Sequence, residues 1–123
     1  MQFNQLQLAA MVKAGKTMAL ADGKIQENEL LVITSGLKKF GVSKRDFDAI
    51  LELSEIVNPT DMLSILSKMG NEQKKYVCGY LAAIMASDGD VDDSEVKLWC
   101  FISQLASFPE MTLAEAGAFW VNC

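Results

Sequence analysis

The sequence predicts an all-α fold: a single-domain bundle of about seven helices built from two pseudo-symmetric halves. Three observations support this prediction: apolar residues recur at helical spacing, capping residues separate those stretches, and an acidic motif occurs twice. The chain has 123 residues, half of them hydrophobic, which is enough for one compact core but short for two domains. We therefore expect residues 1–123 to form one domain without a strand.

The first half of the chain contains three predicted helices. Residues 4–21 carry an apolar stripe, and a second stripe ends at Gly41. Ser43 suits the N-cap of a third helix. The residues expected to face inward from the second and third helices are Leu30, Ile33, Leu37, Phe40, Phe47, Ile50, Leu51 and Leu53.

A fourth and a fifth helix follow in the middle of the chain. Asn58 and Pro59 suit the N-cap and the first position of the fourth helix, and Gly70 is expected to end it. Asn71 can cap the fifth helix. Five methionines fall on apolar helical stripes, where this residue usually fills core space rather than binding a soft metal: Met11, Met18, Met62, Met69 and Met85.

The last two helices each have a predicted capping box. Asp92 and Glu95 form the box of the sixth helix, and Thr112 and Glu115 form the box of the seventh, beyond Pro109. The inner stripe of the sixth helix is expected to contain Val96, Trp99, Ile102 and Leu105.

The acidity of the chain is local. The formal net charge is −5, and residues 86–95 contain five carboxylates and no basic residue. Such a patch repels nucleic-acid phosphates and anionic membranes, and no stripe of Lys and Arg offsets it. We therefore expect no nucleic-acid partner. We also expect no direct membrane insertion, because no apolar run approaches the length that spans a bilayer.

Cysteine usage and the N-terminal residues predict a cytoplasmic location. Cys78, Cys100 and Cys123 are an odd set without CxxC spacing, which favours free, mostly buried thiols in a reducing compartment. The first sixteen residues lack the basic start and the cleavage site of a signal peptide.

The acidic motif occurs twice, at a separation of 66 residues. "MALADGKIQENEL" spans residues 18–30 and "IMASDGDVDDSEV" spans residues 84–96. In each copy an apolar stripe ends in Asp-Gly, and a Glu follows seven residues after the Asp. A helix–bend–helix unit used twice indicates two related halves.

The motif is not an EF-hand, although it resembles the second half of one. With Glu95 as the twelfth position, the first and third positions are apolar in both copies: Ile84, Ala86, Met18 and Leu20. Two interpretations stay open. In the first, the motif is a helix boundary, with a left-handed glycine that ends one helix and an acid at the third position of the next. In the second, it is an ion-binding bend. Asp22 and Asp88 continue the core-facing stripes of their helices and lie at helix C-termini, where the helix dipole disfavours a carboxylate.

The doubled A-x-A/S-D-G-x-[I/V]-x-x-x-E resembles the motif of the tellurite-resistance TerB-like family, and the likeness covers nearly the whole chain. The resemblance implies an all-helical bundle of two related halves with divalent metal at its acidic loops. Carried over by position, the implicated residues are Asp22, Glu29, Asp88 and Glu95, and the chemistry of this sequence adds Asp92. Lys24 departs from an acidic loop, so the first copy is expected to bind more weakly.

We therefore expect a non-enzymatic stress-response protein that binds Ca²⁺, Mg²⁺ or Mn²⁺, since carboxylates without histidine favour hard cations. Tellurite is an anion and is not expected to bind this patch directly. The alternative is an interaction module that docks a basic protein, such as the cytoplasmic segment of a membrane protein, without metal. The expected oligomeric state is a monomer or a weak dimer.

Overall fold

The computed structural model describes residues 3–23, 25–87, 91 and 93–122. Within these ranges the chain is all helical, as predicted, and contains no strand. The elements, in chain order, are α1 (Gln5–Ala19), the short 3₁₀ helix η1 (Leu20–Asp22), α2 (Glu27–Lys39), α3 (Lys44–Ile56), α4 (Pro59–Ser67), α5 (Asn71–Ala86), α6 (Asp93–Leu105) and α7 (Leu113–Asn122).

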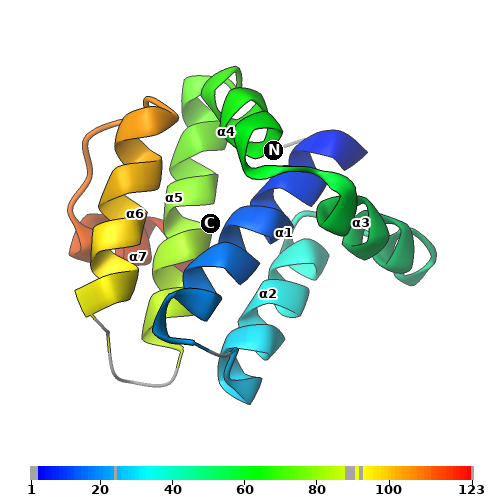
Figure 1. Cartoon of the computed structure of the whole chain (residues 1–123), viewed down its shortest axis with the longest axis horizontal. Helices are drawn as coiled ribbons and strands as arrows, with labels where there is room; N and C mark the ends of the chain where they lie inside the picture. Colours follow the sequence, from blue (N-terminus) through cyan, green and yellow to red (C-terminus); the bar gives the residue numbers. More distant parts are fainter. Residues whose placement is uncertain (1–2, 24, 88–90, 92, 123) are drawn as a thin grey trace.

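Helices α1 and α5 form the centre of the bundle. They pack against each other, and the remaining helices pack around them (Figure 1). Helix α1 contacts α2, α3 and α4, whereas α5 contacts α2, α6 and α7. Both central helices are rich in small buried residues, so other helices can approach them from several sides.

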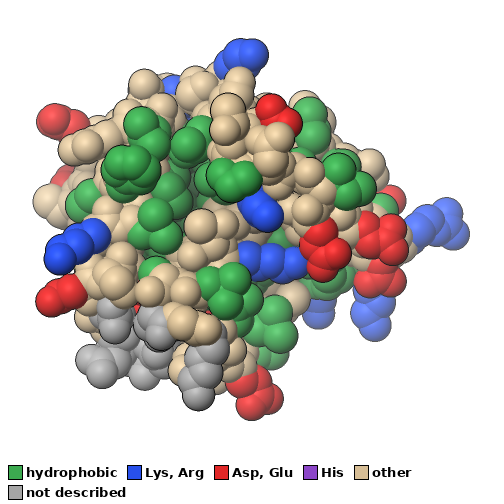
Figure 2. Space-filling view, in the orientation of Figure 1, with side chains coloured by type: hydrophobic (Ala, Val, Ile, Leu, Met, Phe, Trp, Pro, Cys, Tyr) green, Lys and Arg blue, Asp and Glu red, His purple; other side chains and the backbone are tan. Residues whose placement is uncertain are grey.

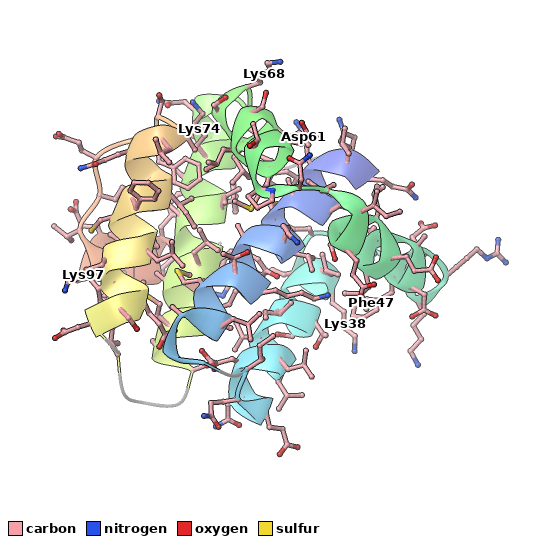
Figure 3. All side chains as sticks on the ribbon, in the orientation of Figure 1. Lys38, Phe47, Asp61, Lys68, Lys74 and Lys97 are labelled. Carbon is pink, nitrogen blue, oxygen red and sulfur yellow. The ribbon has the colours of Figure 1, made fainter. Side chains whose placement is uncertain are left out.

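The surface carries charge and apolar groups in different places. On the face in Figure 2, acidic side chains gather over α3, at the right, and hydrophobic side chains lie over α6, at the upper left. Lys68 and Lys97 extend outward from the bundle (Figure 3). Among the described helices, none is both long enough and apolar enough to cross a bilayer.

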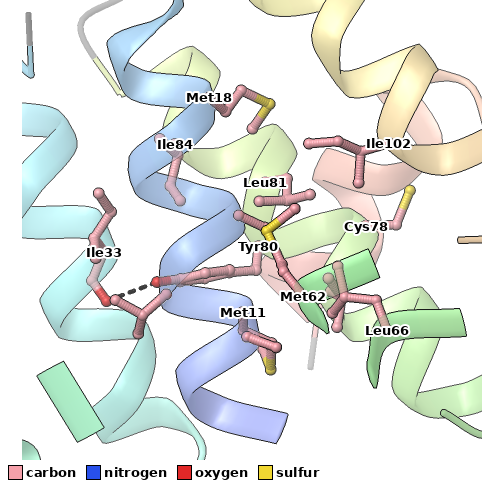
Figure 4. Close-up of a cluster of buried hydrophobic side chains, with 14 of the residues drawn as sticks. Met11, Met18, Ile33, Met62, Leu66, Cys78, Tyr80, Leu81, Ile84 and Ile102 are labelled. Carbon is pink, nitrogen blue, oxygen red and sulfur yellow. Dashed lines mark hydrogen bonds between the residues drawn. The ribbon is translucent and has the colours of Figure 1, made fainter. Parts of the chain in front are cut away.

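The core confirms the interpretation of the methionines. All five predicted core methionines are at most 5% exposed. Figure 4 shows Met11, Met18 and Met62 among the buried side chains between the helices. The fully buried Tyr80 belongs to the same core, where its hydroxyl donates a hydrogen bond of 3.0 Å to the carbonyl of Ile33. This bond satisfies the one polar group that the ring brings into the core.

The last helix, α7, packs on α5. Gly79 of α5 allows the close approach, because a Cβ at that position would lie 2.9 Å from the carbonyl oxygen of Ala116 and 3.0 Å from Cβ of Trp120. The aromatic rings of Tyr80 and Trp120 lie 5.6 Å apart across the same interface. The C-terminal apolar helix is therefore part of the core of its own chain.

Several helix boundaries recur at the 66-residue separation of the two acidic motifs. Helices α2 and α6 begin and end 66 positions apart, and α1 and α5 begin at the same separation. Their N-termini are also alike: Asn4 and Gln7 form a capping box, and Oε1 of Gln73 accepts a hydrogen bond of 3.0 Å from the backbone N–H of Gly70, as Gln7 does from Asn4. Gly70 is thus the N-cap of α5, which corrects the prediction of Asn71, the first helical residue.

The C-termini of α2 and α6 repeat the same turn. Gly41 and Ser107 both have positive φ, +82° and +56°. The next residues, Val42 and Phe108, donate backbone hydrogen bonds to carbonyls five residues earlier, at 3.1 and 2.9 Å. This bond is the signature of the Schellman motif.

Two predicted core residues lie at the surface. Leu30 is 47% exposed and Leu105 is 48% exposed. Each lies at the side of its helix, because the face of the helix that contacts the core is narrower than the apolar stripe in the sequence. Cys100 is also exposed, which corrects the expectation of mostly buried thiols, whereas Cys78 is buried as expected. Both are free thiols.

Candidate cation site at one end of the bundle

Four helix ends gather at the same end of the molecule. The C-termini of α1 and α5 and the N-termini of α2 and α6 all lie at the lower end of the view (Figure 1). The short helix η1, which ends at Asp22 of the first Asp-Gly bend, contacts α6. The fold therefore brings the first copy of the motif against the helix that begins with the second copy.

The helices exclude an EF-hand in both copies, as the sequence predicted. Met18 lies in α1 and Leu20 in η1, and Ile84 and Ala86 lie in α5. The residues that would form the first half of a calcium loop are therefore helical in both copies, and their side chains are apolar where an EF-hand has oxygen ligands. The oxygen ligands that the motif offers therefore lie in its second half.

The first bend has the predicted backbone conformation. Helix η1 ends at Asp22, and Gly23 follows with a φ of +108°, which L side chains rarely adopt. The side chain of Asp22 lies outside the described part of the structure, as do Asp88 and Asp92 entirely. The expectations for these three carboxylates therefore remain predictions.

Glu29 lies where the first copy of the motif predicts it. It is the third residue of α2, and its Oε1 accepts a hydrogen bond of 2.8 Å from the backbone N–H of Gln26, completing a capping box. Only 1% of Glu29 is exposed. A capping glutamate normally lies at the surface, so burial of this carboxylate is the unexpected feature.

Glu95 repeats this arrangement. It is the third residue of α6, it is also 1% exposed, and its Oε2 atom is buried. Placing a carboxylate out of contact with water is costly unless hydrogen bonds or positive charge compensate for it. The structure thus buries the same acid of the motif in both copies, an outcome that the sequence pattern alone did not predict.

The donor chemistry of this end suits a hard cation. Glu29 and Glu95 supply carboxylate oxygens, and the chain contains no histidine. Within the described ranges, no three His, Cys, Asp or Glu side chains lie close enough together to hold a metal ion. A complete site would therefore need Asp22, Asp88 or Asp92, together with water.

The buried thiol of Cys78 and the buried hydroxyl of Tyr80 are chemically unreactive. Burial raises the pKa of the Cys78 thiol to about 11, so this group is protonated near neutral pH. Burial also raises the pKa of the Tyr80 hydroxyl, which is held by Ile33. Neither group is activated as a nucleophile or a base.

Comparison with known proteins places this fold in a family. No family model matches the chain, and no curated protein matches it. The crystal structure of a protein of unknown function from Porphyromonas gingivalis W83 matches with a TM-score of 0.88 and 40% sequence identity, covering 99% of this chain and 92% of that chain. The class is therefore an all-helical, single-domain protein, with helices α1 to α7 in its described residues, whose fold also occurs in a solved structure.

At this identity and coverage, the chain belongs to the same family as the Porphyromonas gingivalis protein.

Proposed function

We propose that the protein is a non-enzymatic, divalent-cation-binding protein that uses its acidic Asp-Gly bends. Its role would resemble that of the tellurite-resistance TerB-like family in stress response. The observation that carries the proposal is the matched burial of Glu29 and Glu95, each 1% exposed and each the third residue of the helix after a bend.

A bound cation gives these buried acids a role that helix capping alone does not require. Capping needs one carboxylate oxygen and no burial, and the bond from Gln26 engages only Oε1 of Glu29. A divalent ion supplies the positive charge that offsets the cost of desolvating a carboxylate. Asp22, Asp88 and Asp92 are the neighbouring acids that the motif offers as further ligands.

The second bend is the stronger candidate. Residues 88–95 contain five carboxylates, whereas the equivalent first segment has Lys24 and Gln26 in place of two of them. Additional anionic oxygens increase affinity for Ca²⁺, Mg²⁺ or Mn²⁺, and the lysine opposes a cation. We expect one tighter site at Glu95 and a weaker one at Glu29.

Thermal unfolding in the presence of CaCl₂, MgCl₂ or MnCl₂ tests this proposal. An ion at a hundredfold excess over its Kd should stabilise the native chain by about 2.7 kcal/mol. Glu95→Gln should remove most of this stabilisation and Glu29→Gln a smaller part, because glutamine preserves the capping box but not the charge.

Glu52→Gln is the matched control, since Glu52 is an exposed acid on α3. This variant should respond to the ions like the wild type. The proposal fails if no ion raises the melting temperature of the wild type more than that of Glu95→Gln.

A further inference from the structure

A groove separates α6 from α7 on the side of the molecule away from α3. Both helices pack against α5, which leaves an open space of about 620 Å³ between them. The walls come from α6, from the connection after it and from the first turn of α7. This volume lies in the range of ligand pockets in proteins.

The floor of the groove is apolar and buried. Trp99 and Phe108 are 6% and 9% exposed, and Met111 lies beside them. The indole N–H of Trp99 donates a 3.4 Å hydrogen bond to the carbonyl of Cys78, which fixes the ring. Lys74, itself buried, donates to the carbonyl of Ser107 at 3.2 Å and holds the end of α6 in place.

The groove also has a polar group suited to a ligand. The Oγ atom of Ser103 is buried and has no hydrogen-bond partner among the described residues. A buried hydroxyl without a partner is disfavoured, because it loses its hydrogen bonds to water and gains none. A ligand that brings a donor or an acceptor into the groove would satisfy it.

The charge on the rim of the groove favours a basic ligand. The charged residues that line the groove are Glu110 and Glu115, both exposed and both acidic. A hydrogen bond from the backbone N–H of Thr112 lowers the pKa of Glu115 and favours its charged form. An apolar floor between acidic rims is complementary to an apolar side chain flanked by basic ones.

The geometry points to a docking site for a peptide segment of a partner protein, in which one apolar side chain rests on Trp99 and Phe108 while a neighbouring Lys or Arg pairs with Glu110 or Glu115. The groove lies on α6 and α7 and uses none of the candidate cation ligands. Peptide docking in the groove can therefore be tested independently of cation binding.

A displayed library of random dodecapeptides tests the inference. Peptides are selected on the wild type and counter-selected on Gln104→Trp, in which a bulky ring at an exposed lining position fills the groove. The retained peptides should share an apolar residue flanked by Lys or Arg. Circular dichroism establishes that the filled variant is folded.

A selected peptide is then titrated into ¹⁵N-labelled protein. The indole N–H signal of Trp99 and the amide signals of Ser103 and Thr112 should shift. Glu110→Gln combined with Glu115→Gln should weaken binding by about three- to tenfold, as expected for exposed ion pairs. The control pair Glu52→Gln and Glu55→Gln on α3 should leave the affinity unchanged, and added salt should weaken binding of the wild type.

Four results would overturn the inference. In the first, the library yields no peptide that binds the wild type better than Gln104→Trp. In the second, the retained peptides lack basic residues, and in the third, the NMR shifts are confined to another face of the protein. In the fourth, the chain forms a dimer that the Gln104→Trp substitution dissociates. The last result would assign the groove to a second copy of the chain.

Discussion

Gln7 and Gln73 lie side by side: Nε2 of Gln73 donates a hydrogen bond of 3.3 Å to Oε1 of Gln7 across 66 residues of chain. Each glutamine accepts a hydrogen bond from the backbone N–H of the N-cap residue of one central helix, Asn4 in α1 and Gly70 in α5. The same interval separates Glu29 from Glu95 and Gly41 from Ser107. Three pairs of residues at this separation therefore have similar local positions in the structure.

The contact between Gly36 and Tyr80 makes a stability prediction. A Cβ at Gly36 would lie 2.4 Å from Cε1 of the Tyr80 ring, which is fully buried and held by Ile33. Gly36→Ala should therefore lower the free energy of unfolding by about 1–3 kcal/mol. Gly117→Ala is the control, because nothing lies within 4 Å of its Cβ position, and it should add about 0.5–1 kcal/mol. Urea denaturation measures both, and equal effects of the two variants would contradict the packing described.

The shared helix end at Gly41 and Ser107 makes a second prediction. Ser107 has a φ of +56°, a conformation that is unfavourable for residues other than glycine. Ser107→Gly should increase the free energy of unfolding by up to about 1 kcal/mol, whereas Gly41→Ala should decrease it by roughly 1–2 kcal/mol. Chemical denaturation checks both signs. Stabilisation by Gly41→Ala would show that this turn is not left-handed in solution.

The two described cysteines should differ sharply in reactivity. Cys100 is exposed, whereas burial raises the pKa of Cys78 to about 11, so about one Cys78 thiol in a thousand is ionised at pH 8. In a Cys123→Ser background, a thiol-specific reagent should modify Cys100 in the native protein and Cys78 only after denaturation. Rapid labelling of two thiols under native conditions would contradict the buried position of Cys78. Cys100→Ser is the control that identifies the labelled site.

The capping bond of Glu115 should make the stability of the protein sensitive to acid. The backbone hydrogen bond from Thr112 lowers the pKa of Glu115 in the folded chain. The stability that this bond contributes is complete above the unfolded-state pKa of about 4.3 and disappears as the pH falls through the lower folded-state pKa. Glu115→Gln should therefore lose less melting temperature than the wild type between about pH 5 and pH 3. Glu110→Gln removes the same charge nearby and should behave more like the wild type.

Much of the fold could be predicted from sequence because its helices are marked by local signals. Asn58 caps α4 and Pro59 follows it, as expected, and Gly41 ends α2 in the left-handed conformation. The error at Gly70 has a local cause: glycine stops a helix more often than it caps one, and here the side chain of Gln73 accepts a hydrogen bond from the backbone N–H of Gly70. The exposure of Leu30 and Leu105 depends on how neighbouring helices pack, which apolar periodicity does not specify.

The candidate site was less predictable than the fold. The motif located Glu29 and its capping role correctly, but it gave no indication that Glu29 and Glu95 would both be buried. Burial depends on how helices far apart in the chain pack together, as η1 and α6 do at this end of the bundle. The α6–α7 groove was missed for a related reason: spacing shows that both helices have apolar faces, not that both use them against α5.

We propose that the carboxylates beside the Asp-Gly bends hold a divalent cation. A crystal soaked in Mn²⁺ and measured for anomalous scattering tests it most directly. The account predicts a peak about 2.0–2.6 Å from a carboxylate oxygen of Glu95, and a weaker peak at Glu29. A soaked crystal with no anomalous peak at either glutamate, or with peaks confined to other parts of the surface, would contradict it.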